Sequence, residues 1–438
     1  MAKDAQGHEL SAGNGDAARH LDDAVRAYIL AYGDLASHMT SAREAAPGCP
    51  MVMLMQAWLL ALSNDRANVA TALRLLDDIR AATLNEREAA HLAALEQVVA
   101  GSWEAGVHLL ERHLMAFPHD ILAHQAALRL DGFLGRFHRG AARSARALPL
   151  WSKNAPGYGM LISFYGFGLE EAGDYGRAED VSRAAAELEP TGYWPHHAVS
   201  HVLEMTGRPR EGLVWMDDRE ALWAGRANTN QIHIHWHKAL FHVELGETEA
   251  ALALCDGPIL STLRPVGTSL CNVSALLLRL EMLGADVGAR WADLARRWEG
   301  STGGSVFNDI HAAIAYLRAG DSDAFGELCR SMQTTAETGR GQAPSYRTVG
   351  LPVVHAFEAF ERGSYREAMN GFLAARFDLE RMGGSKAQRD VVEWALAEAA
   401  IRGGARHVAL ALANERLASR PASVPNQRLL ARAEAIAA

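Results

Sequence analysis

The stretch LISFYGFGLEEAGDYGRAEDVSRAAAELEP, from Leu161 to Pro190, decides the fold. Apolar residues at helical spacing lie on both sides of Gly173, so the stretch predicts two helices joined by a tight turn. Glycine suits the turn because it readily adopts the left-handed backbone conformation that ends a helix. The small residues Gly166 and Ala178 would let the two helices approach closely. Pro190 would end the second helix, because proline lacks an amide donor.

The same helix-turn-helix unit recurs along the chain. Glycines that follow apolar helical stretches stand 34 to 43 residues apart, at Gly101, Gly135, Gly173, Gly207, Gly246, Gly284, Gly320, Gly363 and Gly403. Five positions after most of them stands a small residue, namely Gly106, Gly140, Ala178, Gly212, Ala251, Ala289 and Ala368, with Phe325 and Val408 as exceptions. This period is typical of tetratricopeptide-like repeats. The sequence therefore predicts an all-α, right-handed tetratricopeptide-like superhelix of about ten helix pairs.

We expect a single folded domain. Residues 1–19 are polar and predict a flexible N-terminal tail, whereas residues 20–438 predict one continuous solenoid. The segment at about 334–350 is rich in Gly, Thr and Pro, so we expect an inserted loop there.

The composition excludes several classes of protein. Hydrophobic residues make up 49% and charged residues 22% of the 438 residues, which argues against a disordered chain. The net charge is -9 and the basic residues are scattered, so we expect no nucleic-acid partner. No apolar run is long enough to predict a membrane span, and no signal peptide is expected. The dispersed cysteines Cys49, Cys255, Cys271 and Cys329 form no CxxC pair, which argues against a disulfide framework and favours the cytoplasm.

Four motifs make the chain resemble the tetratricopeptide repeat protein 38 family. They are WPHHAVSHVLEMTGRPREGLVWM at Trp194–Met216, HIHWHKALFHVELG at His233–Gly246, FNDIHAAIAYLRAGD at Phe307–Asp321 and GGSKAQRDVV at Gly383–Val392. The resemblance covers residues from about 20 to 435 and implies a helical repeat fold without naming a reaction. Lys386 in the last motif departs from the family pattern.

The predicted groove carries an unusual set of polar and aromatic residues. In an array of this kind the first helix of each pair lines the concave surface, so positions counted back from a turn glycine indicate which side chains face the groove. Counting back from Gly207 places Trp194, His197, His201 and Glu204 on that side. The two histidines are four residues apart, so they share one helix face.

The following first helices add further candidates. Counting back from Gly246 places His233 and Trp236 in the groove and His237 one position away from it. Counting back from Gly320 places Asp309 and His311 near the groove edge. We therefore expect these residues to bind a ligand together with those of the preceding pair.

We expect this groove to bind a small polar molecule or a peptide segment. The alternative is an enzyme, a metal-dependent or histidine-based acid–base hydrolase or lyase, with His201, Glu204 and His237 as catalytic groups. The sequence names no cofactor, but His197 and His201 suit a divalent metal ion on the alternative interpretation. HExxH is absent, so the spacing alone does not identify a metal enzyme. A further interpretation is that the rings simply pack helix against helix. The ends of a solenoid are also compatible with a homodimer.

Overall fold

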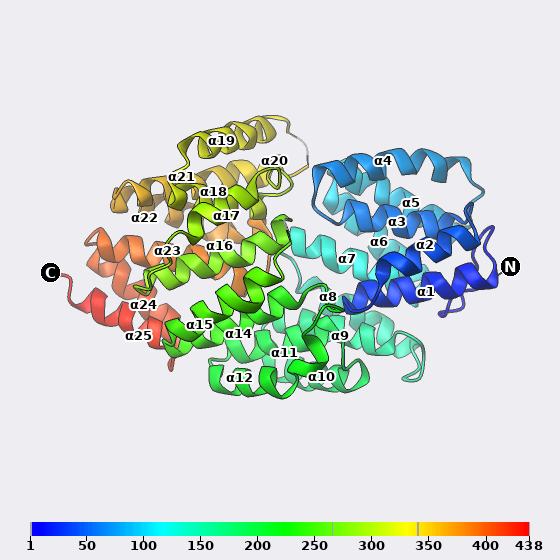
Figure 1. Ribbon diagram of the computed structural model, residues 1–438, viewed down its shortest axis with the longest axis horizontal. Helices are drawn as coiled ribbons and strands as arrows, with labels where there is room; N and C mark the ends of the chain where they lie inside the picture. The colour runs from blue at the N-terminus through cyan, green and yellow to red at the C-terminus, as the bar shows by residue number, and fades with distance from the viewer. Residues whose placement is uncertain (1, 265, 340, 438) are drawn as a thin grey trace. The chain divides into compact units, whose positions relative to one another are not determined.

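The all-α prediction is confirmed. The computed structural model describes residues 2–264, 266–339 and 341–437, and its regular structure over these residues is helical apart from two isolated β-bridges (Figure 1). Contacts within the chain define two compact units. The first unit comprises Met1–Val199 with Arg219–Gln231, and the second comprises Ser200–Asp218 with Ile232–Ala438. The continuity and the handedness of a single solenoid over residues 20–438 stay predictions.

The first unit is built from successive antiparallel helices. They are α1 (Gly15–Leu30), α2 (Leu35–Ala45), α3 (Pro50–Ala61), α4 (Arg66–Ala81), α5 (Glu86–Val99), α6 (Trp103–Ala116), α7 (Ile121–Phe133), α8 (Arg139–Ala147), η1 (Leu148–Leu150), α9 (Tyr158–Glu171), α10 (Tyr175–Leu188) and α13 (Glu220–Trp223). Helix α11 (Tyr193–Met205) begins in this unit and ends in the second.

The second unit continues the same pattern. Its helices are α12 (Pro209–Asp218), α14 (Gln231–Leu245), α15 (Thr248–Leu254), η2 (Cys255–Ile259), α16 (Gly267–Met282), α17 (Arg290–Trp298), α18 (Val306–Ala319), α19 (Ser322–Glu337), α20 (Ala343–Ser345), η3 (Tyr346–Gly350), α21 (Leu351–Glu361), α22 (Tyr365–Ala375), η4 (Arg376–Met382), α23 (Lys386–Arg402), α24 (Arg406–Ser419) and α25 (Val424–Glu434). Each unit has its own hydrophobic core.

The turn glycines behave as predicted in all pairs but the last. Eight of the nine have a positive φ, for example 85° at Gly173 and 68° at Gly207. Gly403 is the exception, because it keeps a helical φ of -77° and the left-handed residue is Gly404, with φ 66°. The left-handed position therefore falls one residue later in the final pair.

Small residues let neighbouring helices approach closely, as the spacing predicted. A Cβ atom added to Gly168 on α9 would lie 2.2 Å from the backbone nitrogen of Ala141 on α8. A Cβ atom added to Gly212 on α12 would lie 2.3 Å from the ring of Phe241 on α14. Glycine is required at these crossings because there is no room for even a methyl group.

Two predictions about irregular segments are wrong. Within the expected flexible tail, Leu10 is fully buried, Asp4 forms an ion pair of 2.7 Å with Arg87, and α1 already begins at Gly15. These contacts hold the segment against the first unit. The expected loop at 334–350 is also mostly helical, because α19 extends to Glu337 and helical structure resumes at Ala343. Pro344 is tolerated in this segment because it lies in the first turn of α20.

In the described residues, no helix has both the length and the apolar character required to cross a bilayer.

The close crossing at Gly168 leads to a stability prediction. Gly168→Ala should lower the unfolding free energy by about 1–3 kcal/mol, because the added methyl group must push α8 away from α9. Gly176→Ala on the neighbouring helix α10 is the matched control, since a Cβ atom there meets nothing within 4 Å. It should be neutral or slightly stabilising. Urea unfolding followed by circular dichroism measures both, and equal midpoints for the two variants would contradict the packing account.

Candidate metal centre

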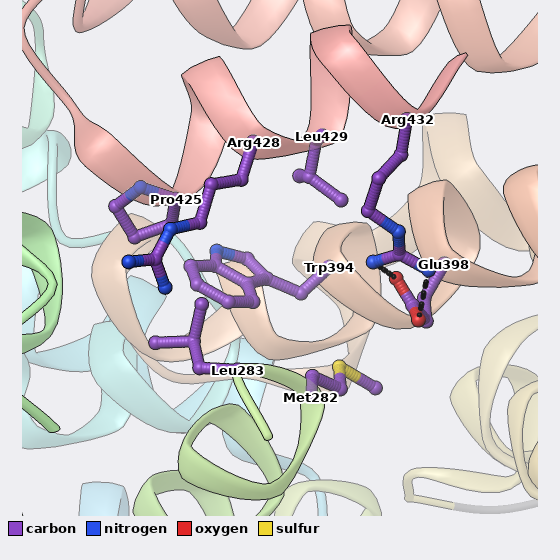
Figure 2. A pocket seen from close by; sticks show the side chains of 8 residues that line it. All are labelled: Met282, Leu283, Trp394, Glu398, Pro425, Arg428, Leu429 and Arg432. Carbon is purple, nitrogen blue, oxygen red and sulfur yellow. Dashed lines mark hydrogen bonds and ion pairs between the residues drawn. The ribbon is translucent and has the colours of Figure 1, made fainter. Parts of the chain in front are cut away.

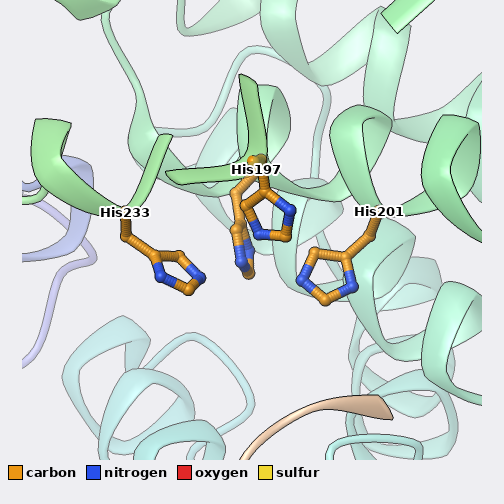
Figure 3. Close-up of side chains that lie close together, drawn as sticks. His197, His201 and His233 are labelled. Carbon is orange, nitrogen blue, oxygen red and sulfur yellow. The ribbon is translucent and has the colours of Figure 1, made fainter. Parts of the chain in front are cut away.

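Helices α11 and α14 bring four predicted histidines together. His201, His233 and His237 belong to the second unit, and His197 lies one turn before His201 on the same continuous helix α11. One ring nitrogen of each lies within 4.8 Å of those of the others. Figure 3 shows the rings of His197, His201 and His233 directed toward a common space. The four-residue spacing on each helix produces this grouping, because it places both rings on one face.

The cluster is closed on most sides. His201 and His237 are fully buried and their ring centroids lie 4.5 Å apart. His233 is only partly buried, and its ring meets that of His237 edge to face at 4.8 Å. The predicted groove is therefore an enclosed site at these residues, with His233 as the member that solvent reaches.

Asn272 on α16 orients the ring of His233. The amide nitrogen of Asn272 donates to the carbonyl oxygens of Thr268 and Ser269, both at 3.1 Å. The amide oxygen therefore faces His233 and accepts from its Nδ1 at 2.5 Å. With the proton of His233 on Nδ1, the lone pair of the imidazole is on Nε2. That electron pair is what a metal ion or a ligand proton would use.

Glu204 holds His237 in the same way. Its Oε2 lies 3.0 Å from Nδ1 of His237, so the carboxylate accepts the Nδ1 proton and Nε2 again carries the electron pair. Burial raises the pKa of Glu204, although the positive charges around it act in the opposite direction. Burial also lowers the pKa of His237 well below its ordinary value, so this ring is neutral at pH 7.

This donor set suits a divalent transition metal. Neutral imidazole is a good ligand for zinc, copper, iron and nickel, and zinc binds histidine nitrogen at about 2.0–2.1 Å. Histidines that bind a metal almost always donate their other ring N–H to a carboxylate or a carbonyl oxygen. His233 with Asn272 and His237 with Glu204 both follow this rule.

A buried arginine sets the charge beside the cluster. Arg279 on α16 is 2% exposed and donates to the carbonyl oxygens of Ala275, at 3.1 Å, and Ala387, at 2.9 Å. Burial lowers the pKa of Arg279 to about 10, which leaves it protonated at pH 7. Its guanidinium lies 5.7 Å from the ring of Trp236, against which His233 stacks with centroids 5.1 Å apart. Trp236, predicted to face a groove, is buried and supports both side chains.

Trp194 supplies no donor atom to this histidine cluster, although its ring meets that of His197 edge to face at 5.8 Å. It is 4% exposed, and its ring packs against Phe164 and Phe167 of α9, with centroids 6.1 and 5.3 Å away. In the structure this tryptophan is a core residue of the first unit. Its prediction as a ligand-binding residue has no support from these contacts.

Asp309 and His311 are also committed to other contacts. Asp309 accepts from the hydroxyl of Tyr346 at 2.7 Å and from the backbone nitrogen of Gly303 at 2.6 Å, so it ties two segments to α18. His311 donates from Nδ1 to the carbonyl oxygen of Phe307 at 2.8 Å, and burial lowers its pKa to about 4. Neither belongs to the group of four histidines.

Sequence reasoning did not identify Asn272 and Arg279. Both lie on α16, within the apolar run CNVSALLLRL that starts at Cys271. The groove positions counted back from Gly284 do not include them. Their position within an apolar helix could have identified them, because a buried amide or guanidinium requires a hydrogen-bond partner and so indicates a polar site.

The motif GGSKAQRDVV contributes to a separate polar pocket of about 340 Å³. This pocket is lined by Met205, Arg376, Leu379, Lys386, Arg389, Asp390, Glu393, Glu415, Arg416, Ser419 and Arg420. Asp390 accepts from Arg416 at 2.8 Å and from Arg420 at 3.2 Å, and Arg420 also donates to Glu244 at 3.1 Å. Arg389 donates to the carbonyl oxygen of Gly384. Ser385 caps α23 and forms a capping box with Gln388.

The first unit contains a second buried histidine cluster that the sequence did not reveal. One oxygen of Asp120 accepts from Nε of Arg87 at 2.5 Å, from His91 at 2.9 Å and from His113 at 3.0 Å. Nδ1 of His91 in turn accepts from the indole of Trp58 at 2.9 Å. Burial would raise the pKa of Asp120, but Arg87 and the two histidines outweigh it and hold that pKa well below its usual range. Here the histidines donate to a carboxylate, so the cluster is a structural network.

Comparisons with known proteins show a distant structural likeness only. No family model matches the chain. The structure titled "Human IFIT1 dimer with m7Gppp-AAAA" is 15% identical, with a TM-score of 0.44 over 98% of this chain and 96% of that chain. A second, "Crystal structure of APC/C hetero-tetramer Cut9-Hcn1", is 13% identical, with a TM-score of 0.31 over 95% of this chain and 96% of that chain. At these values neither likeness supports an argument about ligand or partner.

The network in the first unit leads to a stability prediction. Asp120→Asn should cost about 3–5 kcal/mol of unfolding free energy, because it removes the buried charge that Arg87, His91 and His113 share and leaves Arg87 only its second partner, Asp4. Asp77→Asn, which removes an exposed ion pair with Arg80 on α4, should cost less than about 1 kcal/mol.

The same comparison has a defined pH dependence. A carboxylate with a lowered pKa stabilises the fold above its unfolded value of about 3.9, and the stabilisation disappears as the pH falls through the folded value. The difference in unfolding free energy between wild type and Asp120→Asn should therefore be largest at pH 7 and should decrease below about pH 4. Urea unfolding at several pH values measures it. A gap that does not exceed that of the control variant at pH 7 would contradict the network.

Proposed function

We propose that this chain is a helical-repeat protein that holds a divalent transition-metal ion at His201, His233 and His237. At that ion it binds a small polar molecule through an anionic oxygen. The observation that carries the proposal is the pair of outer contacts, from Nδ1 of His233 to Asn272 and from Nδ1 of His237 to Glu204. Both leave Nε2 as the ligand atom.

The cluster in the first unit is a useful contrast. His91 and His113 both direct Nε2 at one carboxylate oxygen of Asp120, so that nitrogen of each ring has an acceptor. Around His233 and His237 the amide of Asn272 and the carboxylate of Glu204 contact Nδ1 instead, and one ring nitrogen of each clustered histidine lies within 4.8 Å of the others. Several imidazole nitrogens grouped in this way match the donor set that a divalent transition metal prefers.

The charge around the cluster supports a small ligand with an anionic oxygen. Arg279 adds a positive charge that the nearby Glu204 only balances, so a bound divalent cation leaves the site net positive. His233 is the least buried of these histidines, and the site as a whole is enclosed. An enclosed site of this kind favours a small molecule over a peptide segment.

The same geometry keeps a hydrolase or lyase as the second candidate. A divalent metal held by His201, His233 and His237 would supply Lewis-acid chemistry for such a reaction. In this proposal His201 and His237 hold the metal, and Glu204 orients His237 through its Nδ1, so none of the three is the proton-transfer group that the sequence suggested.

Membership of the tetratricopeptide repeat protein 38 family is also part of the proposal, and it rests on the four sequence motifs.

The first test is metal binding by the purified, untagged full chain. After treatment with a chelator, wild type should take up about one zinc ion per chain with high affinity, as expected for a site built from three imidazoles. The His201→Gln, His233→Gln double variant should lose this binding. His242→Gln is the matched control, because His242 lies on the same α14 but forms an ion pair with Glu247 at 2.7 Å. Isothermal titration calorimetry and elemental analysis measure both quantities. Wild type without tight zinc, or a double variant that binds equally, would refute the proposal.

Glu204→Gln tests the outer contact separately. An amide can still hydrogen-bond to His237 but no longer raises the basicity of its ring, so zinc affinity should fall by about 10- to 100-fold while the stoichiometry stays the same. Zinc titration of the two proteins by competition with a fluorescent chelator measures the ratio. Unchanged affinity would show that Glu204 does not support a metal ligand.

A further inference from the structure

A small pocket in the second unit lies apart from the histidine cluster. It has a volume of about 120 Å³ and is formed where the end of α16 meets α23 and α25. Its lining residues are Met282, Leu283, Trp394, Glu398, Pro425, Arg428, Leu429 and Arg432, all shown in Figure 2.

One side of the pocket is apolar and the other is basic. Met282, Leu283 and Leu429 supply the apolar wall. The acidic group of the lining, Glu398, is already neutralised, since it accepts two hydrogen bonds of 2.8 Å from Arg432 and one of 2.8 Å from Arg402. The pocket therefore presents no uncompensated negative charge.

Two hydrogen-bond donors in this pocket have no acceptor among the described residues. Trp394 is 3% exposed, and its indole Nε1 is buried with no partner. Arg428 forms no ion pair or side-chain hydrogen bond within the described part of the chain. Figure 2 shows the indole between Leu283 and Arg428, with its nitrogen on the side of Arg428.

A buried donor without an acceptor is uncommon in proteins and indicates a missing partner. An indole N–H and a guanidinium that face the same space call for an acceptor with negative charge. The guanidinium of Arg416 lies 5.3 Å from the ring of Trp394 but is paired with Asp390, so Arg428 is the pocket's uncompensated positive charge.

We propose that this pocket binds the carboxylate of a short aliphatic acid. The carboxylate oxygens accept from Nε1 of Trp394 and from the guanidinium of Arg428, and the alkyl chain packs against Met282, Leu283 and Leu429. The size of the pocket sets the class of ligand, because cavities of about 150 Å³ accept molecules the size of benzene. At about 120 Å³ the pocket suits a short acid and is too small for the side chains of a peptide segment.

The test follows the indole N–H signals of the full chain by NMR, with sodium propionate as the probe. The chain has 10 tryptophans, and Trp394→Phe assigns the signal of Trp394 by removing it. Propionate should move that signal downfield and saturate, while the other indole signals stay in place. Propionamide, which has the same shape without the charge, should leave it unmoved.

Arg428→Met tests the contribution of the guanidinium to propionate binding, because it removes the charge and keeps an exposed side chain of similar length. Propionate affinity should fall by at least about 10-fold in this variant. Arg362→Met, which alters an exposed arginine on the neighbouring α21–α22 turn, is the control and should bind like wild type. No saturable shift of the Trp394 signal, or an equal response to propionamide, would overturn the proposal. Tighter binding of a peptide with a free C-terminal carboxylate than of propionate would overturn the choice of a small acid.

Discussion

A left-handed glycine ends the first helix of nearly every pair, and this turn determines where the next helix begins. The positive φ at Gly207 and Gly246 sets the lengths of α11 and α14, because neither helix can continue through that conformation. Small residues such as Gly212 then let the following helix come close, as its contact with Phe241 shows. These two constraints place the histidines of α11 and α14 within reach of one another.

Most of the fold was predictable, because the same pattern of turn glycine and small residue recurs in successive helix pairs. The turn glycines and the small residues five positions later identified the helix pairs, and one shifted turn at Gly404 did not alter the pattern. The two irregular segments were mispredicted for a common reason. Polar composition suggested loops, but Leu10 and Ala343 are fully buried by long-range packing that local composition does not encode.

The candidate site was predictable only in part. The four-residue spacing identified His197 with His201, and counting from the turns brought in His233 and His237. Trp194, Asp309 and His311 lie outside the group of four histidines and are buried, because a helix face that appears to line a groove can be covered by its neighbours. Asn272 and Arg279 were missed because their partners lie on other helices or on the backbone, and one-dimensional spacing does not show such contacts. Whether a buried histidine group is structural or binds a ligand depends on where the nearest carboxylate lies, which only the structure shows.

The central claim is that Nε2 of His233 and Nε2 of His237 meet at a metal ion. The most direct measurement is a crystal structure of the zinc-treated protein, with data collected on both sides of the zinc absorption edge. The account predicts one strong anomalous peak about 2.0–2.1 Å from both Nε2 atoms and from a nitrogen of His201, with Nδ1 of the first two rings still bonded to Asn272 and Glu204. No peak between these rings, or a peak bound through Nδ1 after the rings had turned away from Asn272 and Glu204, would contradict it.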